Sequence, residues 1–343
     1  MKSPSFVRTS LALGALALMP VLPIRVFAAP RVAQPTVAPI EKAPVAKARK
    51  AGAAHEGYIQ ALRGRNGSVD AAQTLIRRFV PLHGNGPSIS LVAAVHIGEK
   101  SYYQQIQRFL DKQDVVFYEG VKPSRSAAKT HSAHVAKPPV DAKPPIGIQK
   151  KMSDALQLQY QLDGIHYNRP QFRNSDLDWD TLSALATKAG PDTQQLLARL
   201  QNSVAGGPTI TRGDQIVDRV LALSASTPLL ATILRRLLIR ALSDPDNLEN
   251  EGAKSGSVAA KKLDLILVDE RNKAVLADIT ALLKTSKRSS PHPVRSIAVF
   301  YGAAHMGDIE RHLTADLGYR SAGEQWLCAI RAIHSPTSPI SRQ

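Results

Sequence analysis

The stretch SIAVFYGAAHMGDIERHL, residues 296–313, decides the fold class. Its first half is a run of apolar, β-branched and aromatic residues, which is typical of a buried strand. The run narrows to Gly302, Ala303 and Ala304, and His305 follows at once, before apolar residues begin to recur at helical spacing. We therefore expect a strand that turns directly into a helix, with His305 at the turn.

A second stretch, SISLVAAVHIGEKSYYQQIQRFL at residues 88–110, repeats this plan with His96. In open α/β sheets, ligands bind beyond the carboxyl ends of the strands, so we expect both histidines on that rim. The next apolar run, DVVFYEG, carries Glu119 at its end. If the strands are neighbours, the three side chains meet there. Two imidazoles and a carboxylate form a ligand set suited to a divalent cation.

The remaining patterns complete an α/β protein. Two apolar runs on either side of the turn GNGP at residues 84–87 predict a β-hairpin. Between residues 146 and 290 apolar residues recur every three or four positions, which predicts a large helical insertion. The last apolar run, residues 319–330, predicts a closing edge strand. The predicted fold is a mixed β-sheet built from two strand-histidine-helix units with the helical insertion between them.

The charge of the chain bears on its partners. A net charge of +16 and a pI near 10.0 would ordinarily suggest nucleic acid. Much of the excess lies in two stretches rich in lysine, proline and alanine, residues 29–56 and 122–151, which contain no aromatic residue for base stacking. We therefore expect no specific nucleic-acid partner, but a loose attraction to anionic envelope polymers or lipid head groups. The single cysteine, Cys328, excludes an internal disulfide.

The N-terminus indicates the compartment. Lys2 and Arg8 precede an apolar run at residues 11–24, and small residues follow near Ala28. This pattern predicts a signal peptide and a secreted or periplasmic protein, with an uncleaved N-terminal membrane anchor as the alternative. The predicted organisation is a signal peptide at 1–28, a disordered linker at 29–56, one domain at 57–335 and a tail at 336–343. Within the domain lie a flexible basic loop, 122–151, and the helical insertion, 146–290.

One segment of the insertion has two interpretations. PLLATILRRLLIRAL, residues 228–242, combines three arginines with a broad apolar surface. A buried core helix is the interpretation we favour, and a helix lying on a membrane surface is the alternative.

The ordered series of motifs resembles the TraB/PrgY/GumN family, in the superfamily that includes the Tiki proteins. The resemblance is to its paired Gly-x-x-His motifs with an intervening glutamate. GAAH at 302–305 matches in full, AAVH at 93–96 has alanine in place of glycine, and VVFYEG carries Glu119. Further similarity lies in QYQLDGIHYNRPQFRNSDLDW at 159–179 and in DERNKAVLADI at 269–279. The resemblance covers most of residues 88–330.

Tiki proteins look like metal-dependent proteases, so the resemblance implies a secreted metal-dependent hydrolase that acts on peptides. His96, Glu119 and His305 are then the catalytic residues and the metal ligands, with Glu119 as third ligand or general base. Manganese, cobalt and zinc suit this set equally. We expect Arg271 to bind a substrate carboxylate or to hold Glu119, and Asn272 to contribute to substrate binding. The alternative is a non-catalytic envelope protein that binds a peptide signal, haem or another small ligand in the same cleft.

Overall fold

The computed structural model describes residues 57–124, 147–204, 212–243, 258–286 and 293–333. Most strands form one seven-stranded mixed sheet, in the order β1-β2-β3-β8-β5-β7, with β9 also paired to β2. Its strands are β1 (Ile59–Arg63), β2 (Val69–Pro81), β3 (Ser88–Ala94), β5 (Val115–Tyr118), β7 (Phe172–Asn174), β8 (Ser296–Gly302) and β9 (Tyr319–Arg331). A second, two-stranded sheet pairs β4 (Ile97–Gly98) with β6 (Gln159–Tyr160). The mixed α/β fold predicted from the sequence is confirmed.

The centre of the sheet is parallel. Strand β8 lies between β3 and β5 and is parallel to both. All three strands are buried along nearly their whole length, which explains their continuous apolar sequences, because a parallel sheet is covered on both faces. The registration of β3 with β8 runs from Ser88 opposite Ser296 to Ala94 opposite Gly302. Both strands therefore end at the same level of the sheet.

The antiparallel part of the sheet contains the hairpin and the edge strand that the sequence predicts. Strands β2 and β3 form the predicted hairpin, and Gly84 in the turn has a φ of +73°, a conformation that favours glycine. Strand β9 pairs antiparallel with β2, from Tyr319 opposite Pro81 to Arg331 opposite Ala71. Among the described residues β9 has β2 as its one neighbour, as predicted for a closing edge strand.

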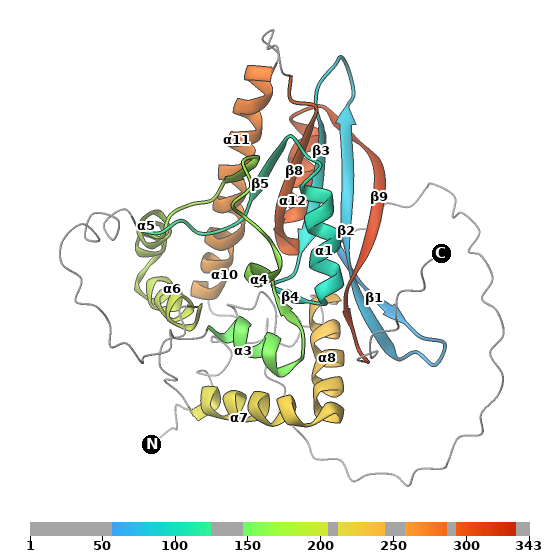
Figure 1. The fold of residues 1–343 in the computed structure, drawn as a ribbon. Helices are drawn as coiled ribbons and strands as arrows, with labels where there is room; N and C mark the ends of the chain where they lie inside the picture. The colour runs from blue at the N-terminus through green and yellow to red at the C-terminus, as the bar shows by residue number, and fades with distance from the viewer. Residues whose placement is uncertain (1–56, 125–146, 205–211, 244–257, 287–292, 334–343) are drawn as a thin grey trace, which may run out of the picture.

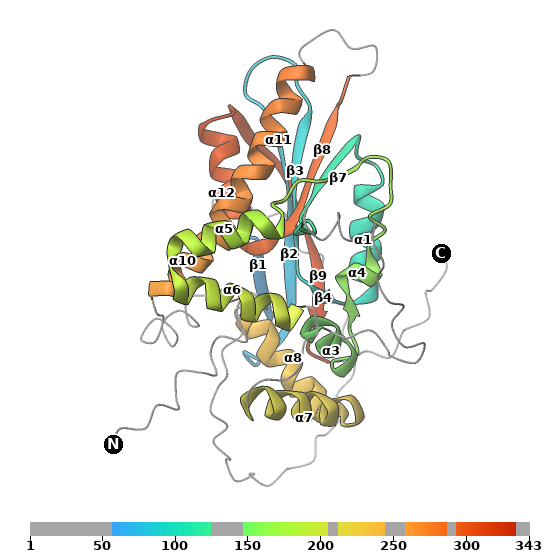
Figure 2. The same ribbon diagram turned by 90° about the vertical axis from the view of Figure 1, so that its left-hand side faces the viewer.

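Helices cover both faces of the sheet (Figures 1 and 2). Alternate residues of β8 point to opposite faces, with Ala298 and Phe300 on one side and Val299 and Tyr301 on the other. The first side packs against α1, α3 and α8, and the second against α11 and α12. The helices are α1 (Lys100–Leu110), α3 (Ile148–Ala155), α4 (Gln161–Gly164), α5 (Trp179–Ala189), α6 (Pro191–Val204), α7 (Arg212–Ser226), α8 (Pro228–Ser243), α10 (Val258–Leu265), η2 (Ile266–Glu270), α11 (Arg271–Ser286) and α12 (Ala303–Ala315).

The region between the two strand-histidine-helix units differs from the prediction in two places. The predicted helical insertion, residues 146–290, contains β6 and also β7, which joins the main sheet beside β5. Strands of two or three residues are too short to show an alternating pattern. The predicted flexible basic loop, 122–151, is wrong at its end, because residues 148–151 form the first turn of α3. Residues 1–56, 125–146 and 336–343, which carry the predicted signal peptide, linker, rest of the basic loop and tail, lie outside the described residues.

The segment at residues 228–242 forms α8 and packs against β1 and β2. Leu238 and Ile239 are buried, as predicted for a core helix. Other apolar residues of α8 remain exposed. Among the described residues, no helix has both the length and the apolar character needed to cross a bilayer.

Arg235 of α8 ties three segments of the domain together. Its side chain is 1% exposed, and it donates hydrogen bonds to the carbonyl oxygens of Leu156, Gln157 and Arg331 at 2.8–3.1 Å. It also pairs with the carboxylate of Glu99, the residue before α1, at 3.0 Å. Burial lowers the pKa of Arg235, and Glu99 opposes this. The guanidinium therefore joins the end of α3, the start of α1 and the end of β9.

We expect Arg235→Met to lower the free energy of unfolding by about 3–5 kcal/mol, because it leaves the Glu99 carboxylate without its cation and three backbone carbonyl groups without their donor. The control is Arg240→Met on the exposed side of the same helix, with an expected change within about 0.5 kcal/mol. Urea denaturation followed by circular dichroism measures both. Equal losses for the two variants would contradict a structural role for Arg235.

Candidate functional site

The structure brings His96, Glu119 and His305 to one rim of the sheet. Because β3 and β8 are parallel and end at the same level, His96, two residues beyond β3, and His305, in the first turn of α12, lie at the same edge. Strand β5 adds Glu119, whose backbone N–H donates to the carbonyl oxygen of Phe300 in β8 at 3.0 Å. The predicted placement at the carboxyl ends of neighbouring strands is thus present in the structure.

Glu119 is held by donors on both carboxylate oxygens. Its Oε2 accepts a hydrogen bond from the backbone N–H of Gly302 at 2.6 Å, and its Oε1 accepts one from Nη2 of Arg271 at 2.7 Å. A Cβ atom at Gly302 would lie 3.2 Å from Oε2, which is tighter than an ordinary contact. Glycine at this position therefore allows the carboxylate to approach the backbone closely.

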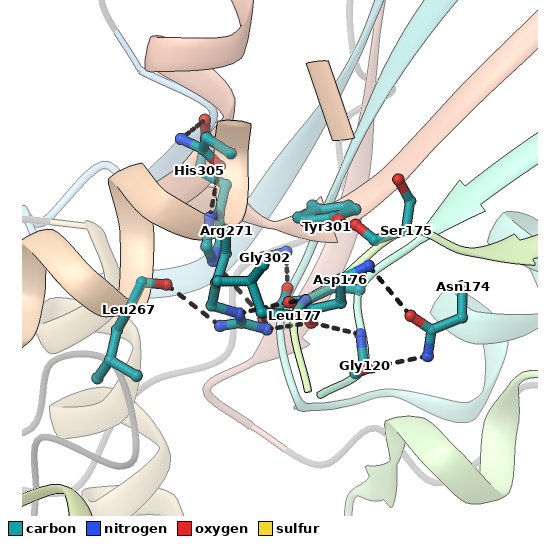
Figure 3. A network of polar contacts seen from close by, with 12 residues as sticks. Gly120, Asn174, Ser175, Asp176, Leu177, Leu267, Arg271, Tyr301, Gly302 and His305 are labelled. Atoms are coloured by element: carbon teal, nitrogen blue, oxygen red, sulfur yellow. Dashed lines mark hydrogen bonds and ion pairs between the residues drawn. The ribbon is translucent and has the colours of Figure 1, made fainter. Parts of the chain in front are cut away.

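Arg271 forms a two-point ion pair with a second carboxylate. Its Nε donates to Oδ1 of Asp176 at 2.9 Å and its Nη2 donates to Oδ2 at 2.7 Å, the paired geometry that suits a guanidinium (Figure 3). The Asp176 side chain is fully buried and also accepts from the backbone N–H groups of Gly120 and Leu177. Asp176 follows β7 and was not among the predicted site residues.

These contacts bear on the two roles predicted for Arg271. A guanidinium has five N–H donors, and those on Nε and Nη2 are used by Asp176 and Glu119, while Nη1 donates to the carbonyl oxygen of Leu267 at 3.3 Å. Burial alone would lower the pKa of Arg271, but the two carboxylates raise it above its ordinary value. The structure shows the role of holding Glu119. Binding of a substrate carboxylate stays a prediction.

Asn272 fixes the orientation of His305. Its Oδ1 lies 2.8 Å from Nδ1 of the imidazole, while its Nδ2 donates to Asp308 at 2.9 Å and to the backbone carbonyl of His305 at 3.4 Å. An amide oxygen only accepts, so Nδ1 carries the hydrogen, and in the neutral ring Nε2 has a free lone pair. That Nε2 lies 3.6 Å from Oε1 of Glu119. Asn272 is fully buried, and its predicted role in substrate binding stays a prediction.

A π-helical segment, η2, directly precedes Arg271 and Asn272. The wider turn shifts the helical phase between α10 and α11. Leu263 before it packs into a cluster with α5 and α6, and Val275 after it packs against the sheet. Because of this shift, one continuous run of helix packs into two separate hydrophobic clusters and places Arg271 and Asn272 at the rim. Irregular turns of this kind are frequent at functional sites.

His96 is electrostatically coupled to the other site residues. Burial lowers the pKa of its imidazole below 6.5, and the charge of Glu119 opposes this while Arg271 and His305 add to it. The imidazole is therefore neutral at pH 7. Its backbone carbonyl accepts from the N–H of Gln161 at 2.8 Å, which ties the loop after β3 to the start of α4.

Glu119 is ionised in the same surroundings. Burial alone would raise the pKa of its carboxyl, but His305, Arg271 and His96 outweigh burial and hold the pKa well below 4.5. Each carboxylate oxygen already accepts one hydrogen bond and keeps a second lone pair. The site therefore combines an ionised carboxylate with the neutral imidazole of His96.

This donor chemistry fits a divalent cation. Metal ligands must be deprotonated, and a neutral His96 and an ionised Glu119 meet that requirement. The 3.6 Å between His305 and Glu119 is close to the separation of about 3.4 Å between two ligands of one tetrahedral ion with bonds of about 2.1 Å. Within the described ranges no group of three or more His, Cys, Asp or Glu side chains is placed so that it could hold a metal ion. The metal stays a prediction.

No family model, curated protein or solved structure matches the chain. The resemblance to the TraB/PrgY/GumN family therefore rests on the motifs and their order along the sequence.

The depressed pKa of Glu119 predicts a pH dependence of stability. Unfolded Glu119 takes up a proton as the pH falls through about 4.5, whereas the folded carboxyl stays ionised to lower pH. Its contribution to the free energy of unfolding is therefore complete above about pH 5 and falls as the pH is lowered. We expect Glu119→Gln to lose stability less steeply than the unmodified protein between pH 5 and pH 3, as measured by urea denaturation.

The control for this measurement is Glu270→Gln, which removes a partly exposed carboxylate paired with Lys273. This variant should keep the steep acid dependence of the unmodified protein. If Glu119→Gln keeps it as well, Glu119 does not have the depressed pKa that its contacts imply.

Proposed function

We propose that the protein is a metal-dependent hydrolase whose centre is formed by His96, Glu119 and His305. The observation that carries the proposal is the fixed approach of Nε2 of His305 to Oε1 of Glu119, 3.6 Å apart, at the carboxyl ends of parallel strands. Each partner is held by its own contact, His305 by Asn272 and Glu119 by Arg271. A rim of this kind is where α/β proteins place their ligands.

The proposed ligands of a divalent ion are the two imidazoles and the Glu119 carboxylate. Such an ion would supply Lewis acidity, lowering the pKa of water towards 7 and polarising a carbonyl group. Asn272 would act on the ring of His305 as outer partners of metal ligands usually do, by fixing its tautomer and its orientation. Arg271 and the N–H of Gly302 would do the same for Glu119.

The protonation states favour one of the two roles predicted for Glu119. A general base works best when its pKa lies near the working pH, and the pKa of Glu119 is held well below 4.5. Its carboxylate is therefore better suited to bind a cation than to take a proton from water. His96 is neutral at pH 7, so its imidazole has a nitrogen lone pair that could bind a cation or accept a proton from water.

The substrate class is proposed from the resemblance to the Tiki proteins, which points to peptides. Nitrogen and oxygen donors together suit manganese, cobalt and zinc, so the proposal extends to any of the three. A secreted or periplasmic location, proposed from the N-terminal sequence pattern, would place the site in contact with envelope peptides.

We expect the purified protein to retain about one divalent ion per chain after loading with manganese, cobalt or zinc and dialysis. His305→Ala should lose most of this metal and all hydrolysis of a mixed peptide library, because it removes a ligand. Glu119→Gln should also lose both. His312→Ala, two turns along the same helix and half-exposed, is the matched control and should keep both. Elemental analysis and mass spectrometry of the library give the two measurements.

Two results would count against the proposal. Cleavage that continues in the presence of a chelator, or in His305→Ala, would show that the metal centre does not carry the reaction. Metal retention without cleavage of any peptide would favour the alternative, an envelope protein that binds its ligand at the same rim.

A further inference from the structure

Helix α8 presents an exposed face that mixes apolar and cationic side chains. At 3.6 residues per turn, Leu229, Ile233, Arg236, Leu237 and Arg240 fall within an arc of about 100°. The three apolar residues are 71%, 46% and 40% exposed. The sequence of α8 contains no acidic residue. This set of five residues is called the α8 face below.

The α8 face is not required for the packing of the domain. The opposite side of the helix, with Arg235, Leu238 and Ile239, is the side buried against the rest of the domain. Two elements in contact with α8 also carry an exposed leucine, Leu62 of β1 and Leu223 of α7. Three large aliphatic side chains exposed side by side on one helix face indicate an interaction surface.

The α8 face also borders an open hollow of about 230 Å³. Its lining consists of Ser68, just before β2, Val69, the first residue of β2, and Ile233, Leu237 and the two arginines of α8. The Nε atom of Arg236 is buried and has no hydrogen-bond partner among the described residues. Buried donors without an acceptor are rare, and this atom does not tie the Arg236 side chain to an acceptor within the described part of the domain.

The composition of the α8 face identifies the chemistry of its partner. Arginines attract phosphate groups, and the leucine and isoleucine side chains between them gain free energy by leaving water. A membrane surface offers both, as phosphate head groups beside acyl chains. Single-stranded nucleic acid would call for aromatic side chains to stack on its bases, and the α8 face has none. A free phosphate ion would leave the exposed leucines unused.

We propose that the α8 face binds the surface of an anionic lipid bilayer, with Arg236 and Arg240 on lipid phosphates and Leu229, Ile233 and Leu237 in the interface. This inference goes beyond the proposed function and does not depend on it, because no residue of the α8 face belongs to the rim that carries His96, Glu119 and His305. Each arginine near an anionic surface strengthens binding about fivefold.

The test uses the full chain with a fluorophore that responds to the polarity of its surroundings. In a Cys328→Ala background, the label is attached at Leu229→Cys and, as a control, at Leu265→Cys, which is also exposed but lies at the end of α10. The probes are vesicles of phosphatidylcholine alone and of phosphatidylcholine mixed with phosphatidylglycerol. A local label reports on α8 itself, whatever other segments of the chain do.

We expect the label at position 229 to shift to the blue with the anionic vesicles alone, and the label at 265 to stay unchanged. Adding Arg236→Gln and Arg240→Gln should raise the lipid concentration that gives half of the full blue shift about 25-fold. The matched control, Arg173→Gln with Arg320→Gln, removes two exposed arginines elsewhere and should change it far less.

Three results would overturn the inference. The first is an unshifted label at position 229, and the second is an equal shift of the labels at 229 and 265. The third is an equal change of the required lipid concentration by the α8 double substitution and by its control. Soluble polyphosphate serves as a further probe. An equal blue shift with polyphosphate alone would assign the α8 face to a soluble polyanion instead of a membrane.

Discussion

The parallel pairing of β3 with β8 is the constraint on which the candidate site depends. These strands lie about 200 residues apart in the sequence, and their registration makes Ala94 and Gly302 neighbours at the end of the sheet. Each strand is followed within three residues by a histidine, so the pairing sets the positions of both imidazoles. Strand β5 on the other side of β8 adds Glu119 to the same rim. A slip of this registration would separate the groups that the site combines.

The ion pairs around Arg271 fix the relative positions of the side chains at this rim. A buried salt bridge is weak evidence for stability, because the free energy needed to remove two charges from water is about as large as the free energy gained from their attraction. Its clearer effect is on geometry. Arg271 joins the start of α11 to Asp176 after β7 and to Glu119 after β5, and Asn272 beside it fixes His305 on α12. Four segments distant in sequence are thereby held in one polar cluster, with an ionised carboxylate facing an imidazole.

The sequence predicted those parts of the structure that have a local signal. The hairpin has a strong turn signal, and the two strand-histidine-helix units each combine a continuous apolar run with a helical period of three to four residues. Topology then predicted the meeting of His96, Glu119 and His305, since the carboxyl ends of parallel strands share an edge. Strands β4, β6 and β7 were missed because two or three residues show no period.

The remaining contacts have no periodic signal in the sequence, although Asp176 lies in the stretch 159–179 that contributes to the family resemblance. Asp176 reaches Arg271 across 95 positions of sequence, and such a pairing is set by the fold alone. The π-helical segment η2 lies inside a sequence whose apolar spacing continues through it, so its shift of phase could not be predicted. Arg235 interrupts the apolar pattern of α8, yet it is among the most deeply buried side chains because backbone carbonyl groups surround it.

Diffraction from crystals soaked in manganese, recorded near an absorption edge of the metal, would test most directly whether the rim of the sheet is a metal centre. We expect one anomalous peak at about 2.0–2.2 Å from Nε2 of His305 and a carboxylate oxygen of Glu119, with the imidazole of His96 as a further ligand. Such a peak would join the three groups into one site. A rim without a peak, with the ion pair between Arg271 and Glu119 intact, would contradict the metal centre and leave Glu119 as a structural carboxylate.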